Sequence, residues 1–136
     1  MPLPDHEIDV TGLPLTDFVE IIRDERGIPH IYGTNVDDIL FAQGYVHAQD
    51  RFWQLEFWSH LSTGRLASLI GEPGVGADLL FRTFGFHKIA LEEYENLEPE
   101  FKQDLINYTN GVNAYIESRP QNRLSLEHFV LSLIHI

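Results

Sequence analysis

The chain has the length of one domain and is strongly acidic. Of its 136 residues, 43% are hydrophobic and 12% are aromatic, which is enough apolar material for a core. The net charge of −12 disfavours nucleic acid and anionic membranes as partners, because both attract a basic face. The lack of cysteine excludes disulfides and thiol chemistry. No signal peptide is visible at the start, and no apolar run approaches the ~20 residues of a membrane span.

The N-terminal quarter predicts a β-hairpin. Strand-forming side chains run from Phe18 to Tyr32 on either side of a charged turn, and a weaker alternation over residues 8–10 favours an earlier strand. Gly27 suits the end of the turn because glycine tolerates positive φ. Pro29 cannot donate to a β-ladder, so it belongs at the start of a strand or on an edge. We therefore expect a hairpin from Phe18 to Tyr32.

A long helix is predicted from Val36 onward. Thr34 or Asn35 can cap it, and its apolar residues recur every three or four positions in two adjacent stripes. Gly44 weakens a helix by about 1 kcal/mol relative to alanine, so its place in so regular a pattern indicates close approach of another element. The stripes are Phe41, Tyr45, Ala48, Phe52 and Leu55, and Ala42, Val46, Trp53 and Phe57.

The rest of the chain is expected to be helical with two interruptions. The long helix is expected to break at residues 62–64, with one or two further turns over 65–70, and residues 71–76 are predicted to form a loop. Asp78 is expected to cap a helix that runs to about Tyr94, and Pro99 to open a last helix that Arg119 and Pro120 end. The inward-facing residues are predicted to be Leu80, Phe84 and Leu91, and then Phe101, Leu105, Tyr108, Val112, Tyr115 and Ile116.

Four polar residues interrupt the aromatic pattern of the long helix, and they are His47, Gln49, Asp50 and Arg51. One interpretation is a ligand set or an acid–base pair, although a histidine and an aspartate three apart supply only two metal ligands. The other is structural, with Asp50 paired to Arg51 and His47 bonded to nearby backbone. The structural interpretation is favoured.

The other candidates for chemistry have simpler explanations. His30 follows a proline on a strand and is expected to be a packed or edge residue, and none of the seven histidines belongs to a metal-binding motif. Residues 71–76 have glycines but lack the Lys-Ser/Thr of a phosphate loop, and no serine stands in a nucleophile-elbow pattern. The aromatic cluster could line a substrate pocket, but its helical spacing favours a core. It consists of Phe52, Trp53, Phe57 and Trp58.

Four ordered motifs together resemble the penicillin acylase family of amide hydrolases. They are RDERGIPHI at residues 23–31, GYVHAQDRFWQ at 44–54, GRLASLIG at 64–71 and GVNAYI at 111–116. The residues of the first two motifs that are expected to have structural roles are Arg23, Asp24, Gly27, Pro29, His30, Gly44, Gln49, Asp50 and Arg51.

The resemblance implies a fold and a chemistry that lie mostly outside these residues. Family members have a four-layer αββα fold and are made as precursors that divide into a smaller α chain and a larger β chain. The N-terminal serine of the β chain is the nucleophile, and its own α-amine is the base. The substrates are acyl amides such as penicillins and acyl-homoserine lactones.

For this chain, the resemblance implies an α+β piece of that fold, an N-terminal β-hairpin followed by helices. No catalytic, cofactor or metal residue is therefore assigned here. A calcium ion is expected only in the full-length enzyme, with its α-chain acid beyond Ile136. The expected partners are the β chain and the rest of the precursor, and the expected compartment is the periplasm or the cell exterior.

The domain assignment has two parts. Residues 1–130 match the N-terminal part of the α chain, whereas residues 131–136 resemble translated sequencing adapter and are expected to be a foreign tail. The alternative for the tail is an ordinary gene-fragment boundary. The alternative for the whole chain is a small non-catalytic helical binding module or partner subunit, which the surplus of aromatic residues on the long helix disfavours.

Overall fold

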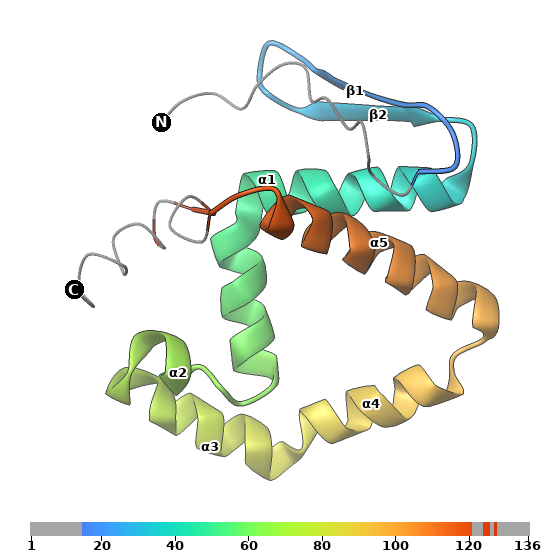
Figure 1. Cartoon of the computed structure of the whole chain (residues 1–136). Helices are drawn as coiled ribbons and strands as arrows, with labels where there is room; N and C mark the ends of the chain where they lie inside the picture. The colour runs from blue at the N-terminus through green and yellow to red at the C-terminus, as the bar shows by residue number, and fades with distance from the viewer. Residues whose placement is uncertain (1–14, 121–123, 126, 128–136) are drawn as a thin grey trace. The chain divides into compact units, whose positions relative to one another are not determined.

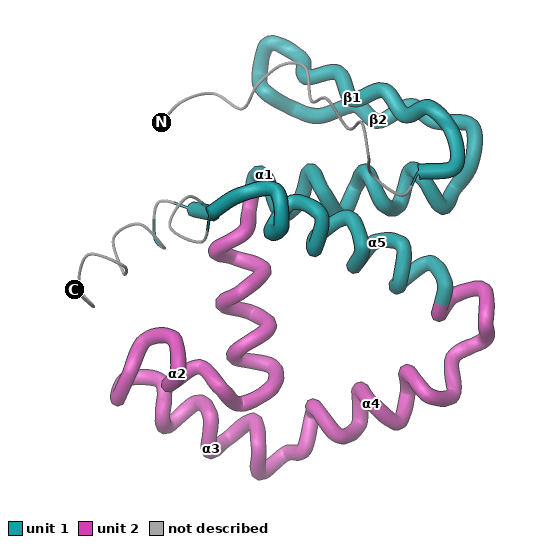
Figure 2. Tube along the Cα trace, in the orientation of Figure 1, with its two compact units in different colours: residues 1–50, 103–136 teal, residues 51–102 magenta. Residues whose placement is uncertain are grey.

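The computed structural model describes residues 15–120, 124, 125 and 127. They belong to two compact units, which are described separately (Figure 2). Unit 1 comprises residues 1–50 and 103–136, and unit 2 comprises residues 51–102. The strand favoured at residues 8–10 and the tail at 131–136 lie outside the described residues.

Unit 1 begins with the predicted β-hairpin. Strand β1 (Val19–Arg23) pairs antiparallel with β2 (Pro29–Gly33), and Ile21 lies opposite Ile31 in the register. Pro29 is the first residue of its strand, where no ladder bond is lost. Arg23 lies opposite Pro29 in the register. Because alternate residues of a strand point to the same face, the side chains of Ile21 and Arg23 share one face of the sheet. The hairpin prediction is confirmed.

Helix α1 (Val36–Ser62) follows, as predicted, and its first half lies alongside the hairpin (Figure 1). Of the two candidate caps, Asn35 fills the role, because its Oδ1 accepts the backbone N–H of Asp38 at 2.8 Å. The backbone leaves helical geometry at Arg51 (φ −139°, ψ 31°), the first residue of unit 2. A single continuous helix was expected there.

Two reciprocal glycine contacts join α1 to helix α5 (Pro99–Glu117) within unit 1. A Cβ at Gly44 would overlap the carbonyl oxygen of Tyr108, and a Cβ at Gly111 would overlap that of Phe41. The backbones are therefore in direct contact, as the position of Gly44 predicted. Among the described residues of unit 1, the buried apolar ones are Val19, Phe41, Ala42, Tyr45, Val46, Ala48, Tyr115 and Leu124.

Unit 2 contains the second half of α1 and a series of short helices. They are α2 (Ala67–Ile70), the 3₁₀-helix η1 (Glu72–Gly74), α3 (Val75–Phe84) and α4 (Phe86–Asn96). The predicted break after Ser62 and the short helix before Ile70 are confirmed.

Three predictions for the chain after α1 are wrong. Residues 71–76 are not a loop, because η1 and the start of α3 occupy them. Asp78 caps no helix that runs to Tyr94, because it lies inside α3 and because Gly85, at φ 72°, separates α3 from α4. Several residues predicted to face inward are exposed, and these are Leu80, Phe84, Leu91, Phe101 and Leu105.

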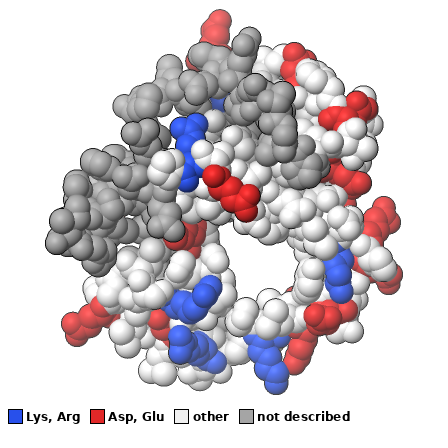
Figure 3. Space-filling view, in the orientation of Figure 1, with Lys and Arg blue, Asp and Glu red and all other residues white. Residues whose placement is uncertain are grey.

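Charged side chains of both signs are interspersed on the face of the described residues that Figure 3 draws. On the visible face, Asp and Glu side chains are spread over several elements, and Lys and Arg lie among them (Figure 3). None of the helices among the described residues combines the length and the apolar character that a membrane span requires.

Candidate functional site: the Arg23–Asp50 junction

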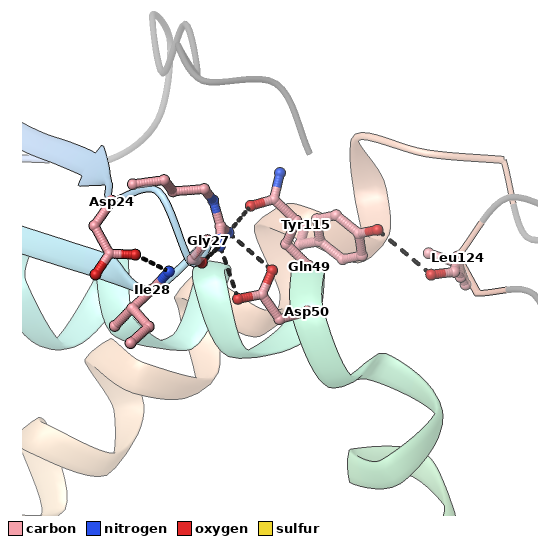
Figure 4. Close-up of polar contacts among 8 residues, drawn as sticks. Asp24, Gly27, Ile28, Gln49, Asp50, Tyr115 and Leu124 are labelled. Atoms are coloured by element: carbon pink, nitrogen blue, oxygen red, sulfur yellow. Dashed lines mark hydrogen bonds and ion pairs between the residues drawn. The ribbon is translucent and has the colours of Figure 1, made fainter. Parts of the chain in front are cut away.

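The first two motifs meet at a buried ion pair between β1 and α1. Arg23 Nη2 donates to Asp50 Oδ1 at 2.8 Å, and Nη1 donates to Asp50 Oδ2 at 3.0 Å (Figure 4). Nη2 also donates to Gln49 Oε1 at 2.6 Å, and Nη1 to the carbonyl of Gly27 at 3.0 Å. One guanidinium therefore binds the turn of the hairpin and two consecutive residues of the helix.

The burial of this junction determines what it can do. The Arg23 side chain is 3% exposed and that of Asp50 is 27% exposed. The bidentate geometry is the strong form of an arginine–carboxylate interaction. The pair uses both carboxylate oxygens of Asp50, each of which is bound by the guanidinium. Its chemistry is therefore structural, and it fixes the hairpin to α1.

The turn of the hairpin is held from within by Asp24. Its carboxylate accepts the backbone N–H of Ile28 at 2.9 Å (Figure 4). It also accepts the backbone N–H of Arg26 at 2.9 Å. The bond from Ile28 is the main reason why the pKa of Asp24 is lowered from its usual value. His30 Nε2 lies 3.6 Å from the same carboxylate. Gly27 adopts φ 77°, as expected for the end of this turn.

A second buried carboxylate anchors the start of α1. Asp38 is 3% exposed and accepts the backbone N–H groups of Thr16 at 3.0 Å and Asp17 at 2.8 Å, and Asn35 Nδ2 at 2.6 Å. Burial alone would raise the pKa of Asp38, but these three hydrogen bonds outweigh it and lower the pKa. The segment before the hairpin is thereby tied to the N-terminus of the helix.

Asp78 plays the corresponding role in unit 2. Its carboxylate accepts the backbone N–H of Leu66 at 2.6 Å and that of Ala67 at 2.9 Å. These are N–H groups at the start of α2, which have no partner within that helix. Asp78 therefore caps α2, eleven residues earlier in the chain, rather than its own helix.

The structure brings together most of the predicted motif residues. Those at the junction or its turn are Arg23, Asp24, Gly27, Pro29, His30, Gln49 and Asp50, and Gly44 lies at the contact with α5. Arg51 is exposed and belongs to unit 2.

Two predictions about the polar residues of α1 are wrong. Asp50 pairs with Arg23 rather than Arg51, because consecutive residues on a helix point in different directions. His47 does not bond to nearby backbone, since its Nδ1 lies 3.0 Å from the hydroxyl of Tyr108 on α5.

Sequence reasoning missed three residues that hold the structure. Asp78 was expected to cap its own helix, but its carboxylate binds backbone at the start of α2. No anchoring role was predicted for Asp38, whose carboxylate binds the backbone of Thr16 and Asp17. Gly111 was noted only as the first residue of the GVNAYI motif, and its contact with α1 was not predicted. Within the described residues, no three His, Asp or Glu side chains gather as a metal site would require.

Comparison with known proteins places this scaffold in a family of hydrolases. The family model described as penicillin amidase matches residues 18–135, which is most of the chain. The chain therefore belongs to the penicillin amidase family, as its motifs predicted.

The relatives are acylases that are much longer than this chain. It is 40% identical over 100 residues to the penicillin acylase 2 proenzyme of Pseudomonas sp. (strain SE83), which covers 74% of this chain and 13% of that protein. The acyl-homoserine lactone acylase QuiP of Pseudomonas aeruginosa is 37% identical over 102 residues, covering 75% of this chain and 12% of that protein. Penicillin G acylase of Escherichia coli is 33% identical over 99 residues, covering 73% of this chain and 12% of that protein.

A solved structure confirms the fold class. The thermostable penicillin G acylase from Alcaligenes faecalis matches with a TM-score of 0.67 and 26% sequence identity. The match covers 82% of this chain and 57% of the matched chain. The α+β arrangement of a hairpin followed by helices is thus that of a penicillin acylase segment.

Proposed function

We propose that this chain is the N-terminal part of the α chain of an acylase that hydrolyses acyl amides, and that it supplies scaffold rather than catalytic groups. The family match over residues 18–135 is the observation that carries the proposal. The geometry supports the scaffold role, because the polar residues of the first two motifs bind one another and the backbone at the junction.

The nucleophile is then expected elsewhere in the precursor, as the N-terminal serine of the β chain. That serine would attack the amide carbonyl, and its α-amine would take up the proton. Backbone or side-chain donors of the β chain would stabilise the tetrahedral oxyanion. Penicillins, acyl-homoserine lactones or related acyl amides are the proposed substrates, since the relatives are named for penicillin and for acyl-homoserine lactones.

Chain lengths support the division of a precursor into two chains. The matched chain of the Alcaligenes structure is about 200 residues long, because 82% of 136 residues corresponds to 57% of it. The Pseudomonas protein, which is named a proenzyme, is about 770 residues long, because 100 residues are 13% of it. A short chain in one relative and a long proenzyme in another are what processing into α and β chains would produce.

Two features of the full enzyme belong to the same proposal. Calcium is proposed to bind only in the full-length protein, because the family resemblance places the α-chain acid beyond Ile136. Export to the periplasm or cell exterior is proposed on the family resemblance.

The test is to express the complete reading frame and this 136-residue chain side by side. Each is assayed with penicillin G and with an acyl-homoserine lactone, and the products of the complete frame are identified by N-terminal sequencing. We expect turnover only from the complete frame, together with a second chain that begins with serine. Turnover by the purified short chain, or an unprocessed active precursor, would contradict the proposal.

A further inference from the structure

Among the large apolar residues of unit 2, more are exposed than buried. Phe52 and Leu66 are its buried apolar side chains among the described residues, whereas ten large apolar residues of unit 2 are exposed. A segment of about 50 residues with so little burial gains too little hydrophobic free energy to offset its ordering. The exposed residues are Trp58, Ile70, Val75, Leu79, Leu80, Phe84, Phe86, Ile89, Leu91 and Phe101.

Helix α3 concentrates this exposure on one side. A helix turns by about 100° per residue, so Val75, Leu79, Leu80 and Phe84 lie within one half of its circumference. Their exposed fractions are 54%, 69%, 51% and 60%. We call these four residues the α3 face. Asp78 lies on the other half of α3, and its bonds to Leu66 and Ala67 hold that half against the start of α2.

We propose that the α3 face is the surface on which the remainder of the same precursor docks, and that this contact stabilises helices α3 and α4. The inference rests on the proposed function and adds the surface and its partner. Monomeric proteins seldom expose a contiguous apolar patch of this kind unless it binds something. The relatives match this chain over only 12–13% of their length, so most of the polypeptide that could cover the face lies outside it.

The rest of the precursor is favoured over a second copy of the chain as the partner of the α3 face, because it belongs to the same polypeptide. A segment of the same polypeptide is present at a high effective concentration, whereas a second copy must be recruited from solution. The face consists of aliphatic and aromatic side chains with Thr83 between them, so the fitting surface is apolar and uncharged.

Hydrogen exchange of the isolated chain tests the first half of the proposal. Amides of α3 and α4 are expected to exchange at least about tenfold faster than those at residues 41–48 and 108–115, where α1 and α5 are in backbone contact. Equal protection of the two regions would overturn the proposal, because α3 and α4 would then need no partner.

Co-expression tests the second half. The tagged chain is produced together with the Pseudomonas sp. SE83 proenzyme from which the matching N-terminal segment has been removed. We expect the two to co-purify in equal amounts and the α3 amides to become protected. Failure to recover the unchanged chain with this partner, or a dimer of the chain formed through α3, would overturn the proposal.

Substitutions on the face make the test specific. Leu80→Asp places a charge on an exposed residue of the α3 face, and Thr83→Asp places one at an exposed position between its residues. Neither removes a buried side chain, and we expect each to lower recovery about tenfold. The matched control is Asn113→Asp, at an exposed position of α5 in unit 1, which should leave recovery unchanged. Equal recovery of all three variants would contradict the assignment of the face.

The same complex separates this proposal from the proposed function. A complex that forms through α3 but hydrolyses neither penicillin G nor an acyl-homoserine lactone supports the docking surface and contradicts the acylase assignment. An active complex whose recovery is unchanged by Leu80→Asp supports the acylase assignment and contradicts the docking surface.

Discussion

At the scale of single residues, the junction depends on Asp50. Asp50→Asn preserves the shape of the side chain but leaves the buried guanidinium of Arg23 without its counter-charge. Breaking a buried ion pair costs about 3–5 kcal/mol, and because Asp50 is partly exposed we expect about 2–3 kcal/mol less stability. Urea unfolding followed by circular dichroism measures the loss.

Arg51→Gln is the matched control for that substitution. It removes a charge from the neighbouring residue, which is exposed, so its effect should stay within about 0.5 kcal/mol. If Asp50→Asn were as mild as Arg51→Gln, the junction would not be holding the hairpin to α1.

At the glycine contacts, substitution by alanine is predicted to lower the stability of the protein rather than raise it. Replacing glycine by alanine inside a helix normally stabilises it by about 1 kcal/mol. At Gly44 or Gly111 the new methyl group would overlap a carbonyl oxygen of the other helix, so we expect a net loss of about 1–3 kcal/mol.

Gly76→Ala supplies the control for this sign reversal. Gly76 lies inside α3, and a Cβ there would meet no other atom within 4 Å, so the ordinary gain should appear. Thermal unfolding tests the Gly44 and Gly111 variants, and hydrogen exchange of the α3 amides tests Gly76→Ala. Stabilisation by Gly44→Ala would show that α1 and α5 are not in backbone contact.

At the scale of elements, the start of α1 should be sensitive to acid. The pKa of Asp38 is lowered in the folded protein, so the unfolded chain takes up a proton at higher pH than the folded one. The stabilisation is therefore complete above the usual aspartate range, near pH 4, and is lost as the pH falls through the lower folded pKa. Asp17 and Asp24, whose pKa values are also lowered, act in the same direction.

This sensitivity is measured by comparing the unchanged chain with Asp38→Asn from pH 7 to pH 2.5. The stability difference between them should be constant at neutral pH and should shrink below about pH 4. A difference that stays the same down to pH 2.5 would mean that the ionised carboxylate contributes nothing.

The cap on α2 gives a local prediction. Asp78→Ala leaves the backbone N–H groups of Leu66 and Ala67 without their acceptor, at a cost of about 1–2 kcal/mol. Hydrogen exchange at these two amides should accelerate. Unchanged exchange there would show that the carboxylate does not cap this helix.

The sequence predicted those elements that have a clear period and a clear end. The hairpin and the stripes of α1 were foreseen because local side-chain alternation specifies them. The division of α3 from α4 was not, because Phe84 and Phe86 continue an apolar pattern across Gly85. The inward faces of these helices were also misjudged, since periodicity identifies an apolar side but not whether this chain itself covers it.

The site was harder to predict than the elements, for a related reason. Arg23 and Asp50 are 27 residues apart, and their pairing depends on how the hairpin packs against α1. The motifs identified these residues through a family resemblance, but only the structure shows that Arg23 is the partner of Asp50. Asp38 and Asp78 were missed as anchors because a carboxylate that binds distant backbone has no local pattern.

At the scale of the whole molecule, we propose that this chain is the scaffold end of a longer acylase precursor. Sequencing the source DNA across the codon for Ile136 tests it most directly. We predict an open frame that continues, after a spacer of a hundred or more residues, into a segment beginning with serine and a strand. A stop codon directly after Ile136 in genomic DNA would contradict the claim and favour a binding module or partner subunit.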